Sequence, residues 1–423
     1  MTLWTRRDTL KTLGSAALAT LAGPASAAYD PLKTNGKRVV VIGGGFGGTI
    51  AAKSLRIADP SLEVILLDRA TKHTMCAGSN LVIGGSRTIE QNSFIYDEIV
   101  YKYGLRFIQE DVTAIDPDKR LIKGSTGDLA YDKLIVAPGI GFRFDEIAGY
   151  DPATTPKKMP HAWIAGEQTT LLRQQLEAMK DGGTVIISIP LTPFRCPPGP
   201  YERISQIAWY FKQAKPKSKI LVLDANPDIA SKGALFRKGW EKHYKGMIEY
   251  RASHKVVKVS PESMTVHTEV EDIKGDVINL IPPQKAGEIA HKAGLVGDDK
   301  RWCPVDPVTF ESKKLPNIHV IGDACIAGAM PKSGFSANSQ AKICAINLAA
   351  KMAGKPPIDP SAANVCYSFI TDKEAISVAA VYRVTEGAIA AVPNAGGLSP
   401  DLSELEGRYG RAWIENIKAE MST

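Results

Sequence analysis

The 423-residue sequence lacks the signals that mark several classes of protein. It has no Cys-x-x-Cys-His motif, so this chain carries no c-type haem of its own. Beyond the N-terminal segment it has no stretch of roughly 18 or more consecutive apolar residues, and we therefore predict no stable membrane insertion. The seven histidines are scattered, so no metal site is predicted. The formal charge of +7 is not gathered into basic runs, which argues against nucleic-acid binding.

The N-terminus has the features of an export signal. Arg6 and Arg7 form a twin arginine, and a short Ala/Gly-rich stretch leads to the small-residue site Ala25-Ser26-Ala27. We expect residues 1–27 to be a twin-arginine signal peptide and the mature protein to be periplasmic. The alternative is a disordered or helical N-terminus of a cytosolic protein. Because the twin-arginine route exports folded proteins, this leader also suggests a bound cofactor.

Six cysteines become informative in such an oxidising compartment, where disulfides can persist. Six cysteines allow 15 pairings, and their spacing alone does not choose among them. They are Cys76, Cys196, Cys303, Cys325, Cys344 and Cys366.

A strand, a glycine-rich turn and a helix open the predicted fold. The apolar run 39–42 is typical of a strand buried in a parallel sheet. It enters Gly43-x-Gly45-x-x-Gly48, and a helical pattern follows. The three glycines permit a tight turn, the close approach of a pyrophosphate and the packing of helix on strand. The helix N-terminus would favour the phosphates.

An acidic residue completes this dinucleotide fingerprint. Residues 63–67 form a second apolar strand that ends at Asp68, twenty residues after Gly48. Asp68 is placed to bind an adenosine ribose hydroxyl, and we assign its neighbour Arg69 to the same cofactor site.

Two later segments favour FAD over NAD. Residues 135–139 (IVAPG) and 319–323 (HVIGD) resemble the second and third FAD motifs of the flavoprotein superfamily typified by glutathione reductase. This resemblance implies that Asp323 binds the ribityl chain of FAD. Residues 331–334 would begin a helix aimed at the flavin pyrimidine edge, where Lys332 and the helix N-terminus would stabilise an anionic reduced flavin. The further cofactor-binding residues in these motifs are Ala137, Gly139 and Gly322.

A second α/β unit repeats the pattern without the glycine fingerprint. Its strand 183–189 and its helix 201–211 are joined by residues 190–200, PLTPFRCPPGP. Bulky side chains, and prolines that have no N–H, cannot cradle a pyrophosphate. We therefore expect no nicotinamide cofactor, which argues against an NADH oxidase or dehydrogenase. Cys196 stands where the phosphate loop would be.

These patterns predict an α/β protein with two Rossmann-like dinucleotide-binding domains, glutathione-reductase-like, the first discontinuous, and a small α+β C-terminal domain. Residues 36–150 and 285–355 are assigned to the FAD-binding domain. Residues 151–284 form the second Rossmann-like domain, which lacks a functional NAD loop. Residues 356–423 form a C-terminal interface domain, with strands expected at 376–382 and 387–392 before a final helix.

Longer stretches resemble one family over essentially the whole mature length, the flavoprotein subunit of flavocytochrome c sulfide dehydrogenase. The stretches are FRCPPGPYER (194–203), DVINLIPPQ (276–284), WCPVD (302–306), GDACI (322–326) with PKSG (331–334), and NVCYS (364–368).

The resemblance implies roles for three cysteines. Cys76 matches the cysteine that joins the flavin 8α carbon by a thioether, although the preceding residues 72–75 depart from the family's more aromatic pattern. Cys196 and Cys366 match a disulfide beside the flavin ring. The alternatives are a buried, small apolar residue at Cys76 and a purely structural bridge between the other two.

The implied reaction is the oxidation of sulfide. Hydrosulfide attacks the disulfide, which leaves a persulfide on one cysteine and a thiolate on the other, and two electrons pass to FAD. Glu202 is a candidate proton acceptor, or else a surface helix residue. The electrons would leave to a separate c-type cytochrome subunit. Trp413 matches a family aromatic near the flavin, or else belongs to a core-facing helix side.

Two other functions stay open. A sulfide:quinone oxidoreductase shares the fold and the chemistry but needs a membrane-facing C-terminus, whereas residues 414–420 are short and charged. An exported flavoprotein without catalytic activity, which keeps FAD for stability, is the second alternative.

Overall fold

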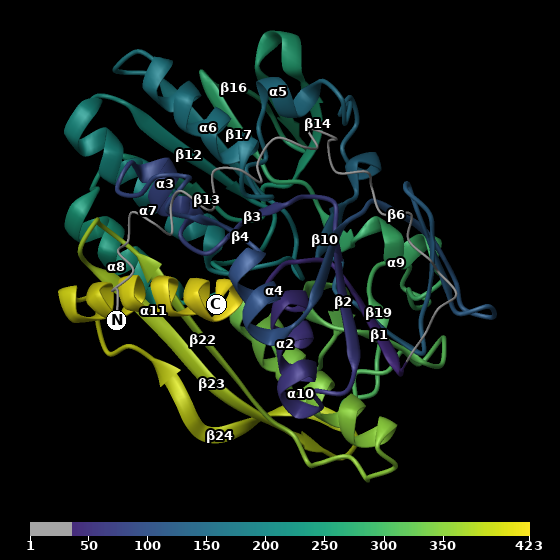
Figure 1. Ribbon diagram of the computed structural model, residues 1–423. Coiled ribbons are helices and arrows are strands. Elements are labelled where there is room, and N and C mark those ends of the chain that lie inside the picture. The colour runs from purple at the N-terminus through teal and green to yellow at the C-terminus, as the bar shows by residue number, and fades with distance from the viewer. Residues whose placement is uncertain (1–35) are drawn as a thin grey trace, which may run out of the picture.

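The computed structural model describes residues 36–423, which form two α/β units and a C-terminal β-rich unit with one long helix (Figure 1). The predicted signal peptide, residues 1–27, lies outside the described residues.

The first unit is built on a parallel five-stranded sheet of order β20-β9-β1-β2-β5. Its central strand is fully buried, with Val39, Val40 and Val41 inaccessible to solvent, as an unbroken apolar run predicts. The strand β20 comes from much later in the chain, so this unit is discontinuous. The strands are β1 (Arg38–Ile42), β2 (Glu63–Asp68), β5 (Arg106–Gln109), β9 (Lys133–Val136) and β20 (Ile318–Val320).

Helices and small sheets surround this sheet. The helices α2 (Gly48–Ala58) and α10 (Gly334–Met352) pack against each other. The other elements are β3 (Lys72–Thr74), α3 (Ser79–Gly84), β4 (Ser93–Ile95), α4 (Asp97–Tyr103), β6 (Val112–Asp116), β7 (Leu121–Gly124), β8 (Asp128–Ala130), β10 (Ile140–Phe142), β18 (Gln284–Ala286), α9 (Glu288–Lys292), β19 (Cys303–Pro304) and β21 (Cys325–Ile326).

The second unit repeats the parallel design with the order β13-β12-β11-β17. Its strands are β11 (Thr184–Ile189), β12 (Lys219–Asp224), β13 (Ile248–Arg251) and β17 (Val277–Leu280), and a small antiparallel sheet holds β14 (Val256–Ser260), β15 (Thr265–Thr268) and β16 (Asp272–Lys274). Its helices are α5 (Thr155–Lys158), α6 (Glu167–Ala178), α7 (Gly199–Ala214) and α8 (Gly233–His243).

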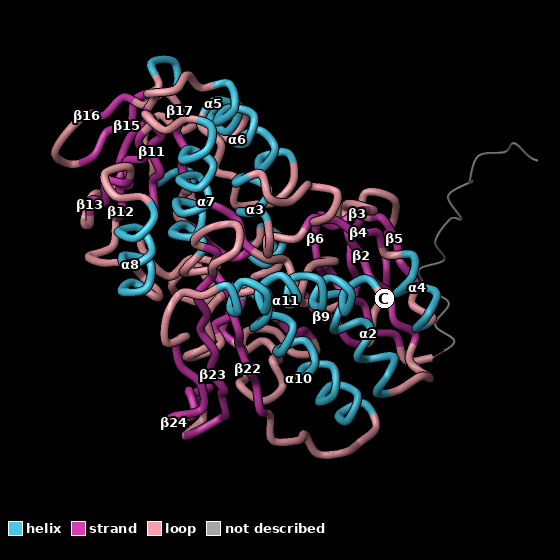
Figure 2. Tube along the Cα trace, turned by 90° about the vertical axis from the view of Figure 1, so that its left-hand side faces the viewer, coloured by secondary structure: helices cyan, strands magenta, loops and turns pink. Residues whose placement is uncertain are grey.

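The C-terminal unit is an antiparallel sheet of β22 (Ser361–Phe369), β23 (Ala375–Thr385) and β24 (Ala388–Leu398), with α11 (Glu404–Ser422) lying across it. Figure 2 shows α11 running over β22 and β23 toward α2 and α4. The Ser403 hydroxyl accepts a hydrogen bond from the Glu406 amide and caps this helix. The buried side chains of α11 include Ile414, Ile417 and Met421, which pack inward.

The predicted fold class is confirmed, because the chain has two Rossmann-like units, the first discontinuous, and a small C-terminal domain. The predicted elements do not include β22, which is nine residues long and carries Cys366.

Candidate functional site

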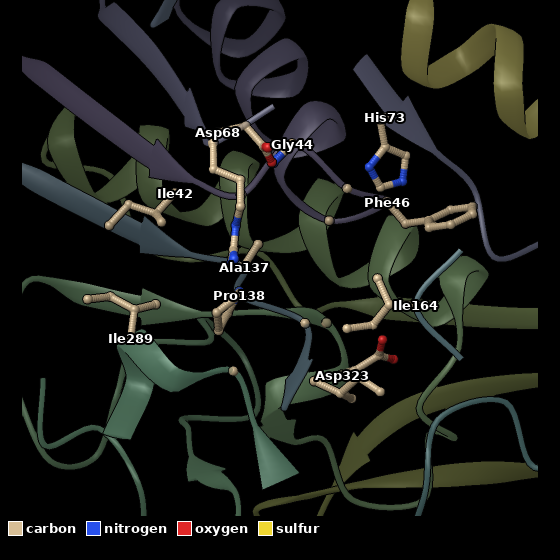
Figure 3. A pocket seen from close by; sticks show the side chains of 18 of the residues that line it. Ile42, Gly44, Phe46, Asp68, His73, Ala137, Pro138, Ile164, Ile289 and Asp323 are labelled. Carbon is tan, nitrogen blue, oxygen red and sulfur yellow. The ribbon is translucent and has the colours of Figure 1, made fainter. Parts of the chain in front are cut away.

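A cavity of about 590 Å³ opens at the carboxyl ends of the first unit's parallel strands, where α/β sheets bind nucleotides (Figure 3). Ile42, Asp68 and Gly44 lie on one side of the pocket in Figure 3, and Ile164 and Asp323 lie on the other. The sequence-predicted residues that line the cavity are Gly43, Gly45, Asp68, Arg69, Cys76, Ala137, Gly139, Gly322 and Asp323.

The glycine turn leaves room that side chains would remove. Gly43 has a φ of +100°, and a Cβ there would lie 2.3 Å from the Ala137 carbonyl oxygen. A Cβ on Gly48 would lie 1.6 Å from the Gly43 carbonyl oxygen, so only glycine lets α2 begin this close to β1. A Cβ on Gly45 would meet only the His73 ring, at 3.5 Å. The Gly45 backbone therefore faces open space that suits a pyrophosphate.

Asp68 is held at the end of β2 by the turn itself. One carboxylate oxygen accepts a hydrogen bond of 2.6 Å from the Gly44 amide, and the other accepts one of 2.9 Å from the Ala70 amide. The acid is thus fixed at the cavity wall beside Arg69, in the position that a ribose hydroxyl requires.

Unpartnered polar atoms mark other parts of the wall. The Oδ1 atom of Asp323 and the Nε2 atom of His73 are buried and have no hydrogen-bond partner among residues 36–423. Burial raises the pKa of Asp323, and burial lowers the pKa of His73 to about 4, so the imidazole is neutral. Buried polar groups are costly when unsatisfied. A bound molecule with hydroxyl or amide groups fits this wall.

Cys76 lies at the edge of the cavity in the loop before α3. Its carbonyl oxygen accepts hydrogen bonds from the amide and the hydroxyl of Ser79, which fix the loop. Burial raises the pKa of the Cys76 thiol. The thiol is available to a molecule in the cavity, and its covalent attachment to a flavin stays a prediction.

Cys196 and Cys366 come together from different units and share a hydrogen bond between their thiols. Cys196 has a φ of +57°, and its amide donates a 2.7 Å hydrogen bond to the Lys332 carbonyl oxygen. Cys196 directly follows Arg195, which lines the cavity. Both cysteines are free thiols here, so the predicted disulfide stays a prediction, with its two members already in contact.

The two thiols differ in acidity. The pKa of Cys366 is lowered to about 7, first by the hydrogen bond from Cys196 and then by the charge of Lys232. The pKa of Cys196 is raised, because that thiol donates the shared hydrogen bond and because it is buried. In the reduced pair, the negative charge therefore resides on Cys366 near neutral pH.

Glu202 points into the protein from the first turn of α7, so its reading as a surface residue is wrong. Its carboxylate accepts hydrogen bonds of 2.8 Å from the Asn80 side chain and from the Phe369 amide. Burial raises its pKa, and its charge acts on both Cys196 and Cys366. A carboxyl group with a raised pKa beside two sulfur atoms is suited to hold a proton.

Three predicted cofactor-binding residues, Gly48, Lys332 and Trp413, do not line the cavity. The Lys332 ammonium donates to the carbonyl oxygens of Asp323 and Cys325, at 2.8 and 2.9 Å, and lies 3.7 Å from the centre of the Trp302 ring. Two carbonyls and an aromatic face thus hold the ammonium, and its contact with a flavin edge stays a prediction. The Trp413 ring lies 6.1 Å from the Tyr367 ring and packs against the core.

Three basic residues of the site were not predicted. Arg195 lines the cavity, while Arg203 and Lys232 are almost fully buried nearby. The Arg203 guanidinium donates to the side chains of Asn80 and Asn279 and to two carbonyl oxygens, and it lies over the Trp163 ring. Arg195 and Arg203 belong to the stretch FRCPPGPYER, which could have indicated them. Nothing in the sequence around Lys232 singles it out.

In the second unit, the acid at the nucleotide position is bonded within the protein. Asp224 ends β12, where an acid would bind the ribose of a nicotinamide nucleotide. Its oxygens instead accept hydrogen bonds from the hydroxyls of Tyr201 and Tyr250, at 2.7 and 2.8 Å, and from Asn226. Together with the proline-rich turn before α7, this arrangement supports the expectation that no dinucleotide binds there.

Within residues 36–423, no cluster of His, Cys, Asp and Glu side chains could hold a metal ion. None of the helices in this range combines the length and the apolar character that crossing a bilayer requires.

Comparison with known protein families gives three matches. Residues 169–282 match the model described as the central part of the sulfide dehydrogenase [flavocytochrome c] flavoprotein chain, and residues 358–421 match the flavin-binding part of flavocytochrome c sulphide dehydrogenase. Residues 37–170 match the pyridine nucleotide-disulphide oxidoreductase model.

Individual relatives agree with these matches. The flavoprotein chain of sulfide dehydrogenase [flavocytochrome c] from Chlorobaculum thiosulfatiphilum is 54% identical over 46 residues, which are 11% of this chain and 96% of that sequence. The mitochondrial sulfide:quinone oxidoreductase of Mus musculus is 25% identical over 308 residues, 68% of this chain and 66% of the mouse protein, so the match spans slightly less than two thirds of that relative. The solved structure of the sulfide:quinone oxidoreductase from Aquifex aeolicus has the same fold, with a TM-score of 0.76 at 19% identity and 91% coverage of both chains.

A side chain at the glycine turn should prevent FAD from binding in the cavity without unfolding the protein. In Gly45→Val, the new side chain points into the open space at the turn, and we expect FAD affinity to fall at least about tenfold, a loss of about 1.4 kcal/mol or more. The measurement is the flavin-to-protein ratio after dialysis, with circular dichroism to check folding. Gly36→Val, placed in open space before the same strand, is the matched control and should keep its flavin. Equal flavin content in the two variants would contradict this placement of the dinucleotide.

Proposed function

This chain belongs to the family of flavoprotein chains of flavocytochrome c sulfide dehydrogenase, and from that premise we propose that it oxidises hydrogen sulfide with bound FAD and passes the electrons to a c-type cytochrome subunit. The observation that carries the proposal is the contact between Cys196 and Cys366 next to the cavity that would hold the flavin. A dithiol that can become a disulfide is the chemical group that a sulfur nucleophile attacks.

The cavity wall fits FAD. The glycine turn and the start of α2 would face the pyrophosphate, Asp68 the adenosine ribose, and the unpartnered Asp323 Oδ1 atom the ribityl hydroxyls. Cys76 would form the thioether to the flavin. When bound, FAD supplies a two-electron acceptor that can return its electrons singly.

The two cysteines perform the sulfur chemistry. Hydrosulfide attacks one sulfur atom of the Cys196–Cys366 disulfide, so one S–S bond forms, another breaks, and a persulfide and a thiolate result. When the disulfide forms again, the outer sulfur atom leaves as zero-valent sulfur and two electrons go to the acceptor in the cavity. One proton is released for each hydrosulfide oxidised, and Glu202 takes it up because its raised pKa lets it hold a proton beside the pair.

A cytochrome acceptor is supported by the family and by the C-terminal helix. The apolar residues Ile414, Ile417 and Met421 of α11 are used in packing within the chain. They are therefore not available to a membrane surface in this conformation. We further propose that the protein acts in the periplasm, on the basis of the twin-arginine segment alone.

A second candidate function is sulfide:quinone oxidoreductase. It is favoured by the 25% identity to the mouse enzyme of that name over 68% of this chain. The chemistry at the cysteine pair would be the same, and only the acceptor would differ.

The identity of the acceptor can be measured directly. Sulfide-reduced protein should be reoxidised at least about a hundredfold faster by oxidised c-type cytochrome than by decyl-ubiquinone. The reason is that a flavin can pass single electrons to a haem without a binding pocket for quinone. Stopped-flow absorbance at the flavin and haem bands gives both rates. Rapid reoxidation by the quinone with none by the cytochrome would replace the first proposal by the second.

Loss of either cysteine of the pair should stop the sulfide half-reaction but keep the flavin. In Cys196→Ser and in Cys366→Ser no disulfide can form, and we expect anaerobic bleaching of the flavin by sulfide to slow by at least about a thousandfold. Cys344→Ala, which changes a buried cysteine of α10, is the matched control and should bleach at the wild-type rate. Wild-type bleaching in both serine variants would exclude the pair from the reaction.

The proposed thioether gives a separate test. After denaturation in acid, the yellow colour should stay with the wild-type polypeptide and should pass into the supernatant from Cys76→Ala, because the thioether survives the loss of folding. The peptide that contains residue 76 should carry the mass of the flavin in the wild type. Free flavin released from the wild-type protein would refute the covalent bond and leave the binding site intact.

A further inference from the structure

We propose that Lys232 is a positioning residue that holds negative charge on the Cys366 sulfur, and that it thereby sets the site's preference for anionic sulfur nucleophiles. This inference rests on the proposed function, since it concerns the same cysteine pair. It goes beyond that function because it assigns a role to a buried cation that no other part of the reaction uses.

Lys232 has a strained backbone conformation and a buried side chain. Lys232 directly precedes α8 and has a φ of +58°, a left-handed conformation that residues other than glycine seldom adopt. Its side chain is only 4% exposed. The ammonium donates hydrogen bonds to the Cys366 carbonyl oxygen at 3.2 Å and to the Ser368 hydroxyl at 2.8 Å. Both contacts tie it to β22, the strand that carries the cysteine.

Both partners of the ammonium are neutral, and an ammonium has three donors. Within residues 36–423, no carboxylate forms an ion pair with Lys232. A buried cation without a counter-ion is costly, so such groups are normally paired. The missing partner must be an anion that exists only in some states of the site.

The local charges show where that anion forms. Lys232 and Arg203 are two buried cations, and both lower the pKa of Glu202. The oxygens of Glu202 are already engaged by Asn80 and by the Phe369 amide. Arg195, directly before Cys196, adds a third cation, so positive charge exceeds negative charge beside the sulfur pair. A thiolate or a persulfide anion on Cys366 balances it.

The groups that face Cys366 from the surrounding elements are few. The Cys366 thiol donates a hydrogen bond of 3.6 Å to the Tyr367 carbonyl oxygen. Cys196 and Lys232 lower the pKa of this thiol, and Glu202 on α7 opposes that effect. From α11, Glu406 and Tyr409 act on the neighbouring Tyr367. From α10, the neutral Ser333 and Ser336 contact Asn364 of β22. Among the described residues, Lys232 is thus the one cation that acts on Cys366.

The sign of the effect follows from the charge. A nearby cation favours the thiolate, so its removal raises the pKa of Cys366 and lowers the thiolate fraction at neutral pH. The same removal makes it harder to place an anionic sulfur next to the pair when hydrosulfide attacks. The reactions of the Cys366 thiolate and the attack by hydrosulfide should then both slow at neutral pH.

The test compares Lys232→Met with Lys232→Arg in the flavin-loaded, full-length protein. After reduction of the pair, the rate of iodoacetamide alkylation at Cys366 is followed by peptide mass from about pH 5 to about pH 10. The wild-type midpoint is expected near the pKa of about 7. In Lys232→Met the midpoint should rise by about one to two pH units, and flavin bleaching by sulfide at neutral pH should slow at least about tenfold. Lys232→Arg should keep both close to wild type.

Lys238→Met is the matched control, because Lys238 lies on α8, the helix that Lys232 precedes, and its side chain is 57% exposed. It should change neither the midpoint nor the bleaching rate. A Lys232→Met protein with the wild-type alkylation midpoint overturns the inference. If Lys232→Met does not fold, Ser368→Ala decides, since it removes the hydroxyl that positions the ammonium. A smaller rise of the midpoint in Ser368→Ala supports the inference, and an unchanged midpoint refutes it.

The two proposals fail in different ways. If sulfide does not bleach even the wild-type flavin, the proposed function is wrong, while the alkylation profiles still decide whether Lys232 controls Cys366. If sulfide bleaches the wild type and Lys232→Met equally fast at every pH, the proposed function is supported and the proposed role of Lys232 is refuted.

Discussion

The contact between Cys196 and Cys366 is the interaction on which the rest of the site depends. One thiol comes from the turn after β11 and the other from β22, so the contact exists only when the second unit and the C-terminal sheet are both in place. The Cys196 amide also bonds to the Lys332 carbonyl, which joins the pair to the first unit. Because the site is made from three units, its rigidity depends on how tightly these units pack together.

Charged residues surround the cysteine pair and make its environment polar. Arg203 and Glu202 are adjacent on α7, and their bonds to Asn80 link the pair to α3 beside Cys76. Lys232, directly before α8, donates a hydrogen bond to Ser368 of β22. Buried charges of this kind add little to stability but can fix the charge of a reacting group. The site therefore favours anionic sulfur, whereas a purely apolar pocket would favour a neutral thiol.

Much of the first unit could be predicted from the sequence because its signals are local. The buried strand β1, the Gly43 to Gly48 turn and Asp68 follow each other within one βαβ segment, and the cavity forms around them. Long-range features were harder. Strand β22 has no clear alternation of apolar and polar residues, and the packing of α10 and α11 against it decides its conformation. Lys332 lies next to the expected helix start, yet the ring of Trp302 and two carbonyl groups determine where its ammonium lies. Lys232 gave no signal, since a lone lysine before a helix is ordinary in sequence.

The most direct measurement of the central claim is to trap the sulfur on the protein. Oxidised, flavin-loaded protein is mixed anaerobically with one equivalent of sulfide, quenched with an alkylating reagent, and digested for peptide mass analysis. The account predicts one additional sulfur atom on the peptide of Cys196 or of Cys366 and none on the other four cysteines. Reduced flavin without an added sulfur on either peptide, or an added sulfur only at another cysteine, would contradict it.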